Sequence, residues 1–465
     1  MPATPNNGRR GPEATIGGAL KRRQGSSVPA RESDPERSEE QIRRRQSRFT
    51  QVSGATGPGR QPPGRRRAAH RYPPSVYRRR RLAAGLTAAL VIAVIVGLAS
   101  LVGGGSKPPR TTTSTRPTTS TTTSPPAGTV GIGIRTVTWT DTDPHAGAVF
   151  NPAPGGSAGP RRLVTEIWYP SVGGSTTAPK AGARPDYGAG PFPVVVFAHG
   201  FDTLPATYAP LLRSWVSAGF VVVAPLFPDE NANEISSLGS ATTLQLENAE
   251  SDIVNEPYDI AYVVGQVESG AAGVASSGAG WLKGLAEPGK YALAGHSDGA
   301  QAVAALVYSQ LATQAYASTY AALATRPFAV IILSGSELSG TYAPPASAPP
   351  MLFVQSAVDQ CNLPQNAAVL LHDSGGGFFL MLLKAHHFPP YVGVGPAAPV
   401  VESVTAAFLK AAAAGTPTLA GLTPAVTSPS IAVLYGPAKP PVLTALPTPT
   451  PAERIAACAI PSSSG

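Results

Sequence analysis

The feature that most constrains the fold is a series of short, continuously apolar runs separated by longer amphipathic or Ala-rich stretches. Runs such as "VVVFA" at 194–198 and "VVVAP" at 221–225 have no polar face, so strands built from them must be buried on both sides. Parallel sheets covered by helices bury strands in this way. The sequence therefore predicts an α/β fold in which helices cover both faces of a mostly parallel sheet.

The predicted elements alternate along the chain, and they place the folded part at 129–415. Strands are predicted over 164–169, 194–198, 221–224, 291–294, 330–333, 351–355 and 378–383. Helices are predicted over 207–218, 251–268, 299–314, 365–372 and 400–414. The remaining residues, 416–465, are Pro-rich and are predicted to form an irregular C-terminal tail.

The region before this domain differs sharply in composition. Residues 1–81 carry 20 Lys or Arg against 6 Asp or Glu, whereas the rest of the chain is net acidic. With few apolar residues, this segment is predicted to be a disordered basic tail. We expect it to contact anionic lipid head groups. A regulatory arm for nucleic acid or protein is the alternative, but its Arg clusters lack interleaved aromatics, so no specific nucleic-acid partner is expected.

Residues 82–102, "LAAGLTAALVIAVIVGLASLV", contain no charge and are long enough to span a bilayer as a helix. "YRRRR" precedes them, so the positive-inside rule predicts a cytoplasmic N-terminus and an extracytoplasmic domain at the cell membrane. A cleaved signal peptide would have a shorter apolar core and a shorter leader, and a buried soluble helix would have nothing to pack on. The Thr/Ser/Pro segment 103–128 is predicted to be an extended linker.

Polar residues follow the predicted strands at the point where each strand ends. "FAHGF" ends in Phe201, "LAGHSDG" contains Ser297, "FVQSAVD" ends in Asp359, and "LLKAHHF" contains His386 and His387. Ligands of an open α/β sheet gather at the carboxyl ends of its strands. The chain order Ser, Asp, His therefore predicts a nucleophile, an orienting carboxylate and a base at one edge of the sheet.

The nucleophile candidate lies in a G-x-S-x-G motif between a strand and a helix. Gly295 and Gly299 permit the crowded turn that exposes Ser297, and His296 is expected to pack beneath it. The alternative is an ordinary turn serine. An imidazole can take the hydroxyl proton near neutral pH, and a carboxylate fixes its tautomer. The backbone N–H groups of Phe201 and Asp298 are the expected oxyanion donors.

Two assignments stay open at this point. Glu337, after another apolar strand, is the alternative to Asp359 as the acid, and His386 is the alternative to His387 as the base. His199 is expected to shape the oxyanion turn instead of acting as a base. The sequence contains no set of residues spaced as metal ligands, so no metal and no cofactor are expected.

These stretches, with "RRLVTEIWYPS" and "LLKAHHFPPY", resemble the α/β-hydrolase superfamily, and within it the group of platelet-activating-factor acetylhydrolases, chlorophyllases and polyester-cleaving cutinases. The "HHF" stretch is similar to the S-H-F of cutinase-like members, which implies His387 as the catalytic base. The resemblance implies hydrolysis of carboxylic esters through an acyl-enzyme, without metal or organic cofactor. Asp298 departs from the group, and we expect its carboxylate to point away from the oxyanion or to pair with a base.

Together these features predict a membrane-anchored serine esterase of lipase-like type, acting on hydrophobic acyl esters. An acyltransferase on the same fold, or a catalytically idle envelope binding protein, is the alternative. Residues 228–252 follow a strand end and are predicted to cap the acyl pocket. In an exported domain, Cys361 and Cys458 are predicted to form a disulfide, with two free thiols as the alternative.

Overall fold

The computed structural model describes residues 131–142, 160–310, 316–338 and 340–460. The predicted basic tail, the membrane-spanning segment 82–102 and the linker 103–128 lie outside the described residues. Within those ranges, no helix is both long enough and apolar enough to cross a membrane.

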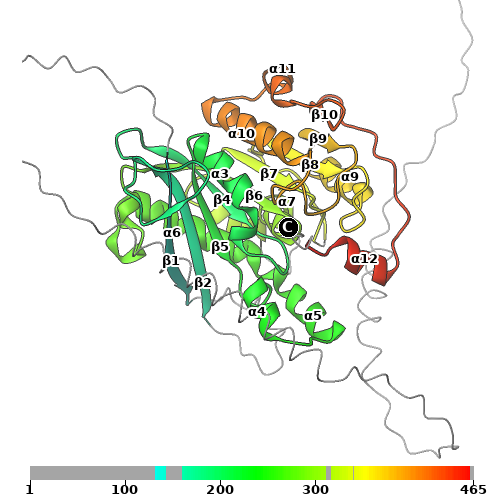
Figure 1. Cartoon of the computed structure of the whole chain (residues 1–465), viewed down its shortest axis with the longest axis horizontal. Coiled ribbons are helices and arrows are strands. Elements are labelled where there is room, and N and C mark those ends of the chain that lie inside the picture. Colours follow the sequence, from blue (N-terminus) through cyan, green and yellow to red (C-terminus); the bar gives the residue numbers. More distant parts are fainter. Residues whose placement is uncertain (1–130, 143–159, 311–315, 339, 461–465) are drawn as a thin grey trace, which may run out of the picture. The chain divides into compact units, whose positions relative to one another are not determined.

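The described strands form one mixed sheet in the order β10-β9-β8-β7-β6-β4-β5-β2-β1-β3 (Figure 1). Neighbours from β9 to β5 run parallel, the pairs β10–β9, β5–β2 and β2–β1 are antiparallel, and the short β3 pairs with β1 in parallel. The strand bounds are β1 Gly131–Asp141, β2 Arg161–Ser171, β3 Lys180–Ala181, β4 Phe192–Ala198, β5 Val221–Leu226, β6 Ala286–His296, β7 Ala329–Leu333, β8 Met351–Ser356, β9 Phe378–Leu382 and β10 Ala432–Tyr435.

Helices cover both faces of this sheet, as the double-sided apolar strands require. The α-helices are α3 Ala209–Ser217, α4 Ala232–Ser237, α5 Thr243–Glu250, α6 Glu256–Ala271, α7 Asp298–Tyr308, α8 Tyr316–Ala322, α9 Pro364–Asp373, α10 Ala398–Ala414, α11 Leu419–Leu422 and α12 Pro451–Ala457. In β4, Val194 and Val196 face the core shared with α6, α7 and α9. Val195 and Phe197 face the core under α3 and α10. The predicted α/β fold with a mostly parallel sheet is therefore confirmed.

Two predicted boundaries differ from the structure. The helix predicted over 299–314 stops at Tyr308, because Ser309 leaves the helix and forms a β-bridge with Tyr342. The folded part does not end at Gly415: β10 pairs with β9 at the edge of the sheet, and the tail continues to α12. A four-residue edge strand within a Pro- and Gly-rich segment has too few residues to show a strand periodicity in the sequence.

The segment 228–252, predicted as a cap, folds into the short helices α4 and α5. Each begins with a side-chain cap, from Asn231 and Thr242 respectively, which satisfies N–H groups of the first turn. The end of α5 leads into α6 by way of a buried turn at 251–254. A capping role over an acyl pocket remains a prediction.

Candidate active site

Ser297 occupies a sharp turn between the end of β6 and the start of α7. Its backbone has φ 54° and ψ −119°, a left-handed conformation that a residue with a side chain rarely adopts. A Cβ atom on Gly295 would overlap the Gly299 carbonyl, and one on Gly299 would overlap the carbonyls at the end of β4. The two glycines therefore let three backbone segments meet at this turn.

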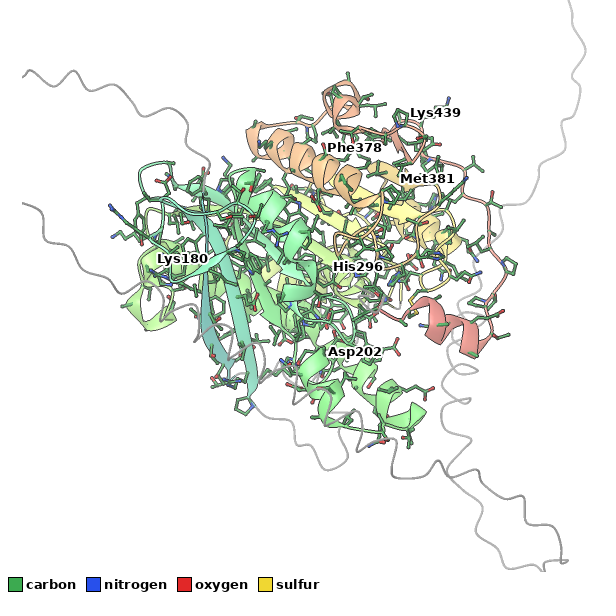
Figure 2. The ribbon with its side chains drawn as sticks, viewed as in Figure 1. Lys180, Asp202, His296, Phe378, Met381 and Lys439 are labelled. Atoms are coloured by element: carbon green, nitrogen blue, oxygen red, sulfur yellow. A yellow bond between two sulfur atoms is a disulfide. The ribbon has the colours of Figure 1, made fainter. Side chains whose placement is uncertain are left out.

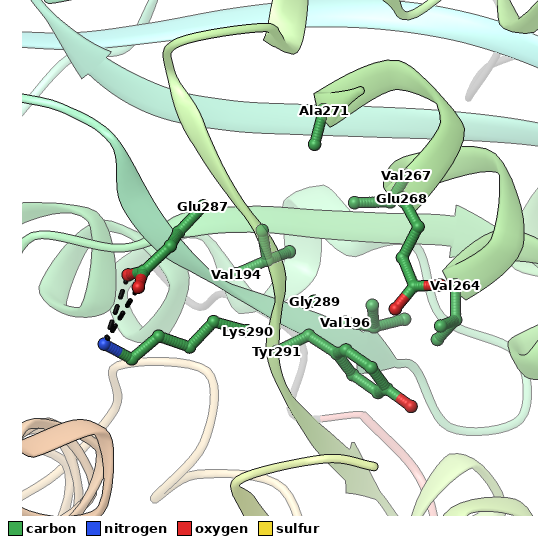
Figure 3. A pocket seen from close by; sticks show the side chains of 10 residues that line it. All are labelled: Val194, Val196, Val264, Val267, Glu268, Ala271, Glu287, Gly289, Lys290 and Tyr291. Atoms are coloured by element: carbon green, nitrogen blue, oxygen red, sulfur yellow. Dashed lines mark hydrogen bonds and ion pairs between the residues drawn. The ribbon is translucent and has the colours of Figure 1, made fainter. Parts of the chain in front are cut away.

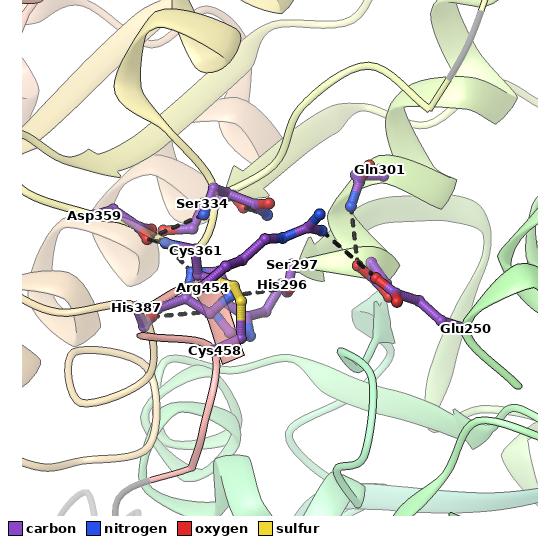
Figure 4. Close-up of a disulfide and its surroundings, with 12 residues drawn as sticks. Glu250, His296, Ser297, Gln301, Ser334, Asp359, Cys361, His387, Arg454 and Cys458 are labelled. Atoms are coloured by element: carbon purple, nitrogen blue, oxygen red, sulfur yellow. Dashed lines mark hydrogen bonds and ion pairs between the residues drawn. A yellow bond between two sulfur atoms is a disulfide. The ribbon is translucent and has the colours of Figure 1, made fainter. Parts of the chain in front are cut away.

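The structure brings Ser297, His387 and Asp359 together in one hydrogen-bonded chain (Figure 4). Ser297 Oγ lies 2.9 Å from His387 Nε2, and His387 Nδ1 lies 2.9 Å from Asp359 Oδ2. Because an ionised carboxylate can only accept, Nδ1 carries the proton and Nε2 is left to accept from the serine hydroxyl. All three side chains are buried, with Ser297 6% exposed.

The backbone around Asp359 holds its carboxylate in position. Oδ1 accepts the backbone N–H groups of Cys361, at 2.9 Å, and Asn362, at 3.1 Å. The Gln355 amide donates to Oδ2 at 3.3 Å and to the Asn362 carbonyl at 2.9 Å. These bonds orient the carboxylate toward His387, because each oxygen is held by groups of a rigid turn.

The alternative acid and base lie elsewhere. Burial, reinforced by the neighbouring Asp373 carboxyl, raises the pKa of Glu337 to about 7, and no bond joins Glu337 to His387 within the described residues. His386 is exposed, whereas His387 is buried against Ser297. Geometry alone therefore selects Asp359 and His387 as the partners of the serine.

The turn after β4 is held by His199, as the sequence predicts for a shaping role. His199 Nε2 accepts the Phe227 N–H at 3.1 Å, so Nδ1 carries the ring proton and donates to the Gly200 carbonyl at 2.9 Å. Burial lowers the pKa of His199 to about 4, which keeps the ring neutral. Thr203 Oγ1 also donates to the Gly200 carbonyl. In a trans peptide the N–H of Phe201 then points the opposite way.

The two predicted oxyanion donors flank the serine. A Cβ on Gly200 would lie 3.0 Å from Ser297 Cβ, so the turn that carries Phe201 touches the nucleophile. Asp298 is the first residue of α7, where an N–H has no acceptor inside the helix. Across the described ranges, neither the Phe201 nor the Asp298 backbone N–H has a hydrogen-bond acceptor. Both are therefore available to a ligand oxygen.

His296 does more than pack beneath the turn. It lies in the interior of the domain, where its ring is 4.8 Å from that of His387 and 4.5 Å from that of Tyr391 (Figure 2). Nε2 donates to the His387 carbonyl at 3.2 Å, so Nδ1 accepts from the Tyr208 hydroxyl at 2.9 Å. Burial, with the charge of His387 as a smaller cause, lowers its pKa well below the usual range. The neutral His296 ring thus holds the backbone carbonyl of His387, the proposed base, by a hydrogen bond. The sequence contains no signal for this contact.

Of the two arrangements expected for the Asp298 carboxylate, pairing with a base is not found among the described residues. Oδ1 accepts the Gln301 amide at 2.9 Å, and the buried Oδ2 has no donor among the described residues. Two further carboxyl groups, Glu230 and Glu256, are fully buried nearby, and the sequence analysis missed both. Burial, reinforced by the Glu250 carboxylate, raises the pKa of Asp298 to about 7.

A disulfide joins Cys361 to Cys458 and brings the C-terminal helix α12 to the site (Figure 4). Cys361 is also the residue whose N–H binds the Asp359 carboxylate. From α12, Arg454 reaches Glu250 of α5 at 3.7 Å. Helix α12 is therefore attached at two places: to the loop that carries Asp359, through the disulfide, and to α5, through Arg454.

A small pocket elsewhere in the domain has no part in this site (Figure 3). It lies between α6 and the first half of β6 and is lined by Val194, Val196, Val264, Val267, Glu268, Ala271, Glu287, Gly289, Lys290 and Tyr291. Lys290 and Glu287 form an ion pair at its rim. Within the described ranges, no group of three or more His, Cys, Asp or Glu side chains is arranged to hold a metal ion.

The sheet order, the crossover helices and the strand–turn–helix at Ser297 define an α/β-hydrolase-like domain. A family model described as Chlorophyllase matches residues 176–248, a range that includes β4, α3, β5 and α4 but not the serine. Among solved structures, the chain is similar to a ferulic acid esterase from Streptomyces cinnamoneus. The two are 19% identical with a TM-score of 0.44, and the match covers 63% of this chain and 94% of that one. No curated protein matches.

Proposed function

We propose that the chain is a serine hydrolase that cleaves carboxylic esters through an acyl-enzyme on Ser297. The observation that carries this proposal is the pair of 2.9 Å contacts from His387, one to Ser297 Oγ and one to Asp359 Oδ2. A turn serine without a chemical role would need neither a buried base nor a carboxylate behind that base. The match to the Chlorophyllase model supports the same class of reaction.

In the acylation step, Ser297 Oγ attacks the ester carbonyl carbon while His387 Nε2 takes the hydroxyl proton. The Asp359 carboxylate accepts from Nδ1–H and stabilises the imidazolium that forms. The tetrahedral oxyanion accepts the N–H groups of Phe201 and Asp298. When the intermediate collapses, the C–O bond to the alcohol breaks and His387 returns its proton to the leaving oxygen. Water then repeats these steps on the acyl-enzyme.

The substrate class and the location of the enzyme belong to the same proposal. We infer a hydrophobic acyl ester, because the resemblance is to esterases of lipids, chlorophyll and polyesters. The uncharged segment 82–102 and the basic residues before it support a single-pass anchor at the cell membrane, with the catalytic domain outside the cytoplasm. The basic tail 1–81 would then lie against the anionic inner leaflet.

The test is covalent labelling of the full chain, purified in mild detergent, with a fluorophosphonate probe. We expect one labelled peptide containing Ser297, and no labelling of Ser297→Ala. Ser336→Ala is the matched control, because the one hydrogen bond of the Ser336 hydroxyl within the described residues is to the Gln301 side chain. Hydrolysis of p-nitrophenyl esters should fall about 10³-fold or more in Ser297→Ala. Folded protein that neither labels nor hydrolyses any ester would overturn the proposal.

A further inference from the structure

Three buried carboxyl groups from three different elements meet behind the oxyanion turn. Glu230 belongs to the turn after β5, Glu256 is the first residue of α6, and Asp298 is the first residue of α7. Glu230 and Glu256 are 0% exposed and Asp298 is 6% exposed. Within the described part of the chain, no donor reaches any carboxylate oxygen of the two glutamates or Oδ2 of Asp298. We call these three residues the carboxyl cluster.

The surroundings do not supply enough positive charge for three carboxylates. Among the described residues, the only buried Lys or Arg is Arg161, and it is already paired with Asp252 at 2.6 Å and Asp259 at 2.7 Å. The N-termini of α6 and α7 together offer about one unit of positive charge. An ionised carboxyl without donors is costly to bury, whereas a protonated one can donate to its neighbour. The cluster therefore has to retain protons.

The cluster is directly connected to the oxyanion donors. Asp298 supplies one donor from its own backbone. The backbone carbonyl of Glu230 accepts the N–H of Asp202, the residue that follows Phe201, at 2.9 Å. Asp202 has φ 53°, a left-handed conformation that Asp adopts more readily than most residues. Glu230 and Asp298 are thus each joined to a segment that carries an oxyanion donor.

We propose that Glu230, Glu256 and Asp298 hold protons as a unit, and that the oxyanion forms faster when Asp298 is protonated. The inference rests on the proposed function of Ser297. The three are positioning residues: they keep negative charge away from a site that must itself accept negative charge. At an effective dielectric constant of about 20, repulsion between an Asp298 carboxylate and the nearby oxyanion would slow acylation on the order of a hundredfold.

Other charged groups face the cluster and set the pH at which it titrates. Glu250 of α5 repels charge on Asp298, and Arg454 of α12 attracts it. Asp252 acts on both glutamates, and Asp259 acts on Glu256. With burial as the largest cause, the pKa of Asp298 is raised to about 7, and those of Glu230 and Glu256 are raised well above their usual range. The first proton is therefore lost within the working range of an esterase.

The activity test is the pH profile of kcat/KM for p-nitrophenyl butyrate, using the full chain in mild detergent. In the wild type, kcat/KM should fall about tenfold per pH unit once the pH exceeds about 7, until it levels off about a hundredfold lower. Asp298→Asn, which keeps the backbone N–H, should remove this fall when its profile is normalised to its own activity at pH 6. Glu256→Gln should shift it to lower pH, because the loss of a carboxyl that repels charge on Asp298 makes Asp298 easier to ionise. Glu247→Gln, an exposed carboxyl on α5, is the matched control and should leave the profile unchanged.

A second readout does not depend on catalysis. Carboxyls that are protonated in the folded chain and ionised in the unfolded chain make the folded state bind more protons. Stability then falls as pH rises from the unfolded value near 4.5 toward the folded value. For each such proton, the unfolding equilibrium constant should rise about tenfold per pH unit in this window. Glu256→Gln should lower this slope, and Glu247→Gln should not.

The two readouts separate the possible failures. A wild-type profile without an alkaline fall, or a fall that Asp298→Asn does not change, would overturn the inference. An unfolding slope that is the same in Glu256→Gln and Glu247→Gln would also overturn it. If the slope changes as expected but Ser297 neither labels nor hydrolyses esters, the proposed function has failed and the proton-holding cluster stands.

Discussion

Replacing both Cys361 and Cys458 by serine should destabilise the domain substantially. The disulfide joins residues separated by 97 positions. In the chain-entropy model, closing a loop of this length stabilises the folded state by about 4.7 kcal/mol, because the cross-link restricts the unfolded chain. The other attachments of the tail are weak. The Arg454–Glu250 pair is 3.7 Å long and both side chains are largely exposed, so it contributes at most about 1 kcal/mol.

The assay is urea unfolding of the full chain, followed by tryptophan fluorescence. Trp139, Trp168 and Trp215 are buried in the sheet cores and report on global unfolding. We expect the double serine variant to lose about 4 to 5 kcal/mol of unfolding free energy. Arg454→Ala, which keeps the disulfide, is the control and should lose less than about 1 kcal/mol.

The same variant should reveal how the tail is attached. Two hydrogen bonds between the Gln365 side chain and the Leu446 backbone, at 2.9 and 3.1 Å, hold the segment before α12. A seven-residue helix does not persist by itself in water. Limited proteolysis should therefore cut between Leu446 and Cys458 in the double variant only. An unfolding free energy within 1 kcal/mol of the wild type, with the tail still protected, would refute the loop-closure reasoning.

Three further predictions concern the site itself. His387→Ala should lower kcat/KM for a p-nitrophenyl ester about 10³-fold or more, whereas His386→Ala should stay within about threefold, since only His387 touches the serine. Asp359→Asn should lower kcat by about 10² to 10⁴ with little change in KM, and an equal loss in Glu337→Gln would contradict the geometry. Thr203→Val removes one hydrogen-bond donor from the Gly200 carbonyl and should lower kcat about tenfold. Thr203→Ser, which keeps the hydroxyl, should restore kcat. An unchanged kcat in the valine variant would mean that His199 holds the turn alone.

The centre of the fold was predictable from local pattern. The strands β4, β5, β7 and β8 are continuous apolar runs. Such runs are typical of strands buried in the interior of a sheet that helices cover on both faces. The periphery was not predictable in this way. β10 consists of four residues at an edge, and it is a strand only because β9 offers it hydrogen-bonding partners.

The candidate site was also predictable only in part from local sequence pattern. Ser297 could be singled out because its two flanking glycines and the strand-to-helix transition are local features. The choice of His387 over His386, and of Asp359 over Glu337, needed distances that only the folded chain supplies. Neighbouring residues in a loop point in different directions, and a sequence does not record which direction faces the serine.

The fold class and the nucleophile candidate could be predicted from the sequence, because both follow from local steric and hydrophobic preferences. That Glu230, Glu256 and Asp298 share one buried space becomes visible only in the folded chain. They come from a turn and two helix starts far apart in the chain. Burial is the largest cause of the raised pKa of each, and neighbouring carboxyl groups add to it. Both causes are consequences of packing.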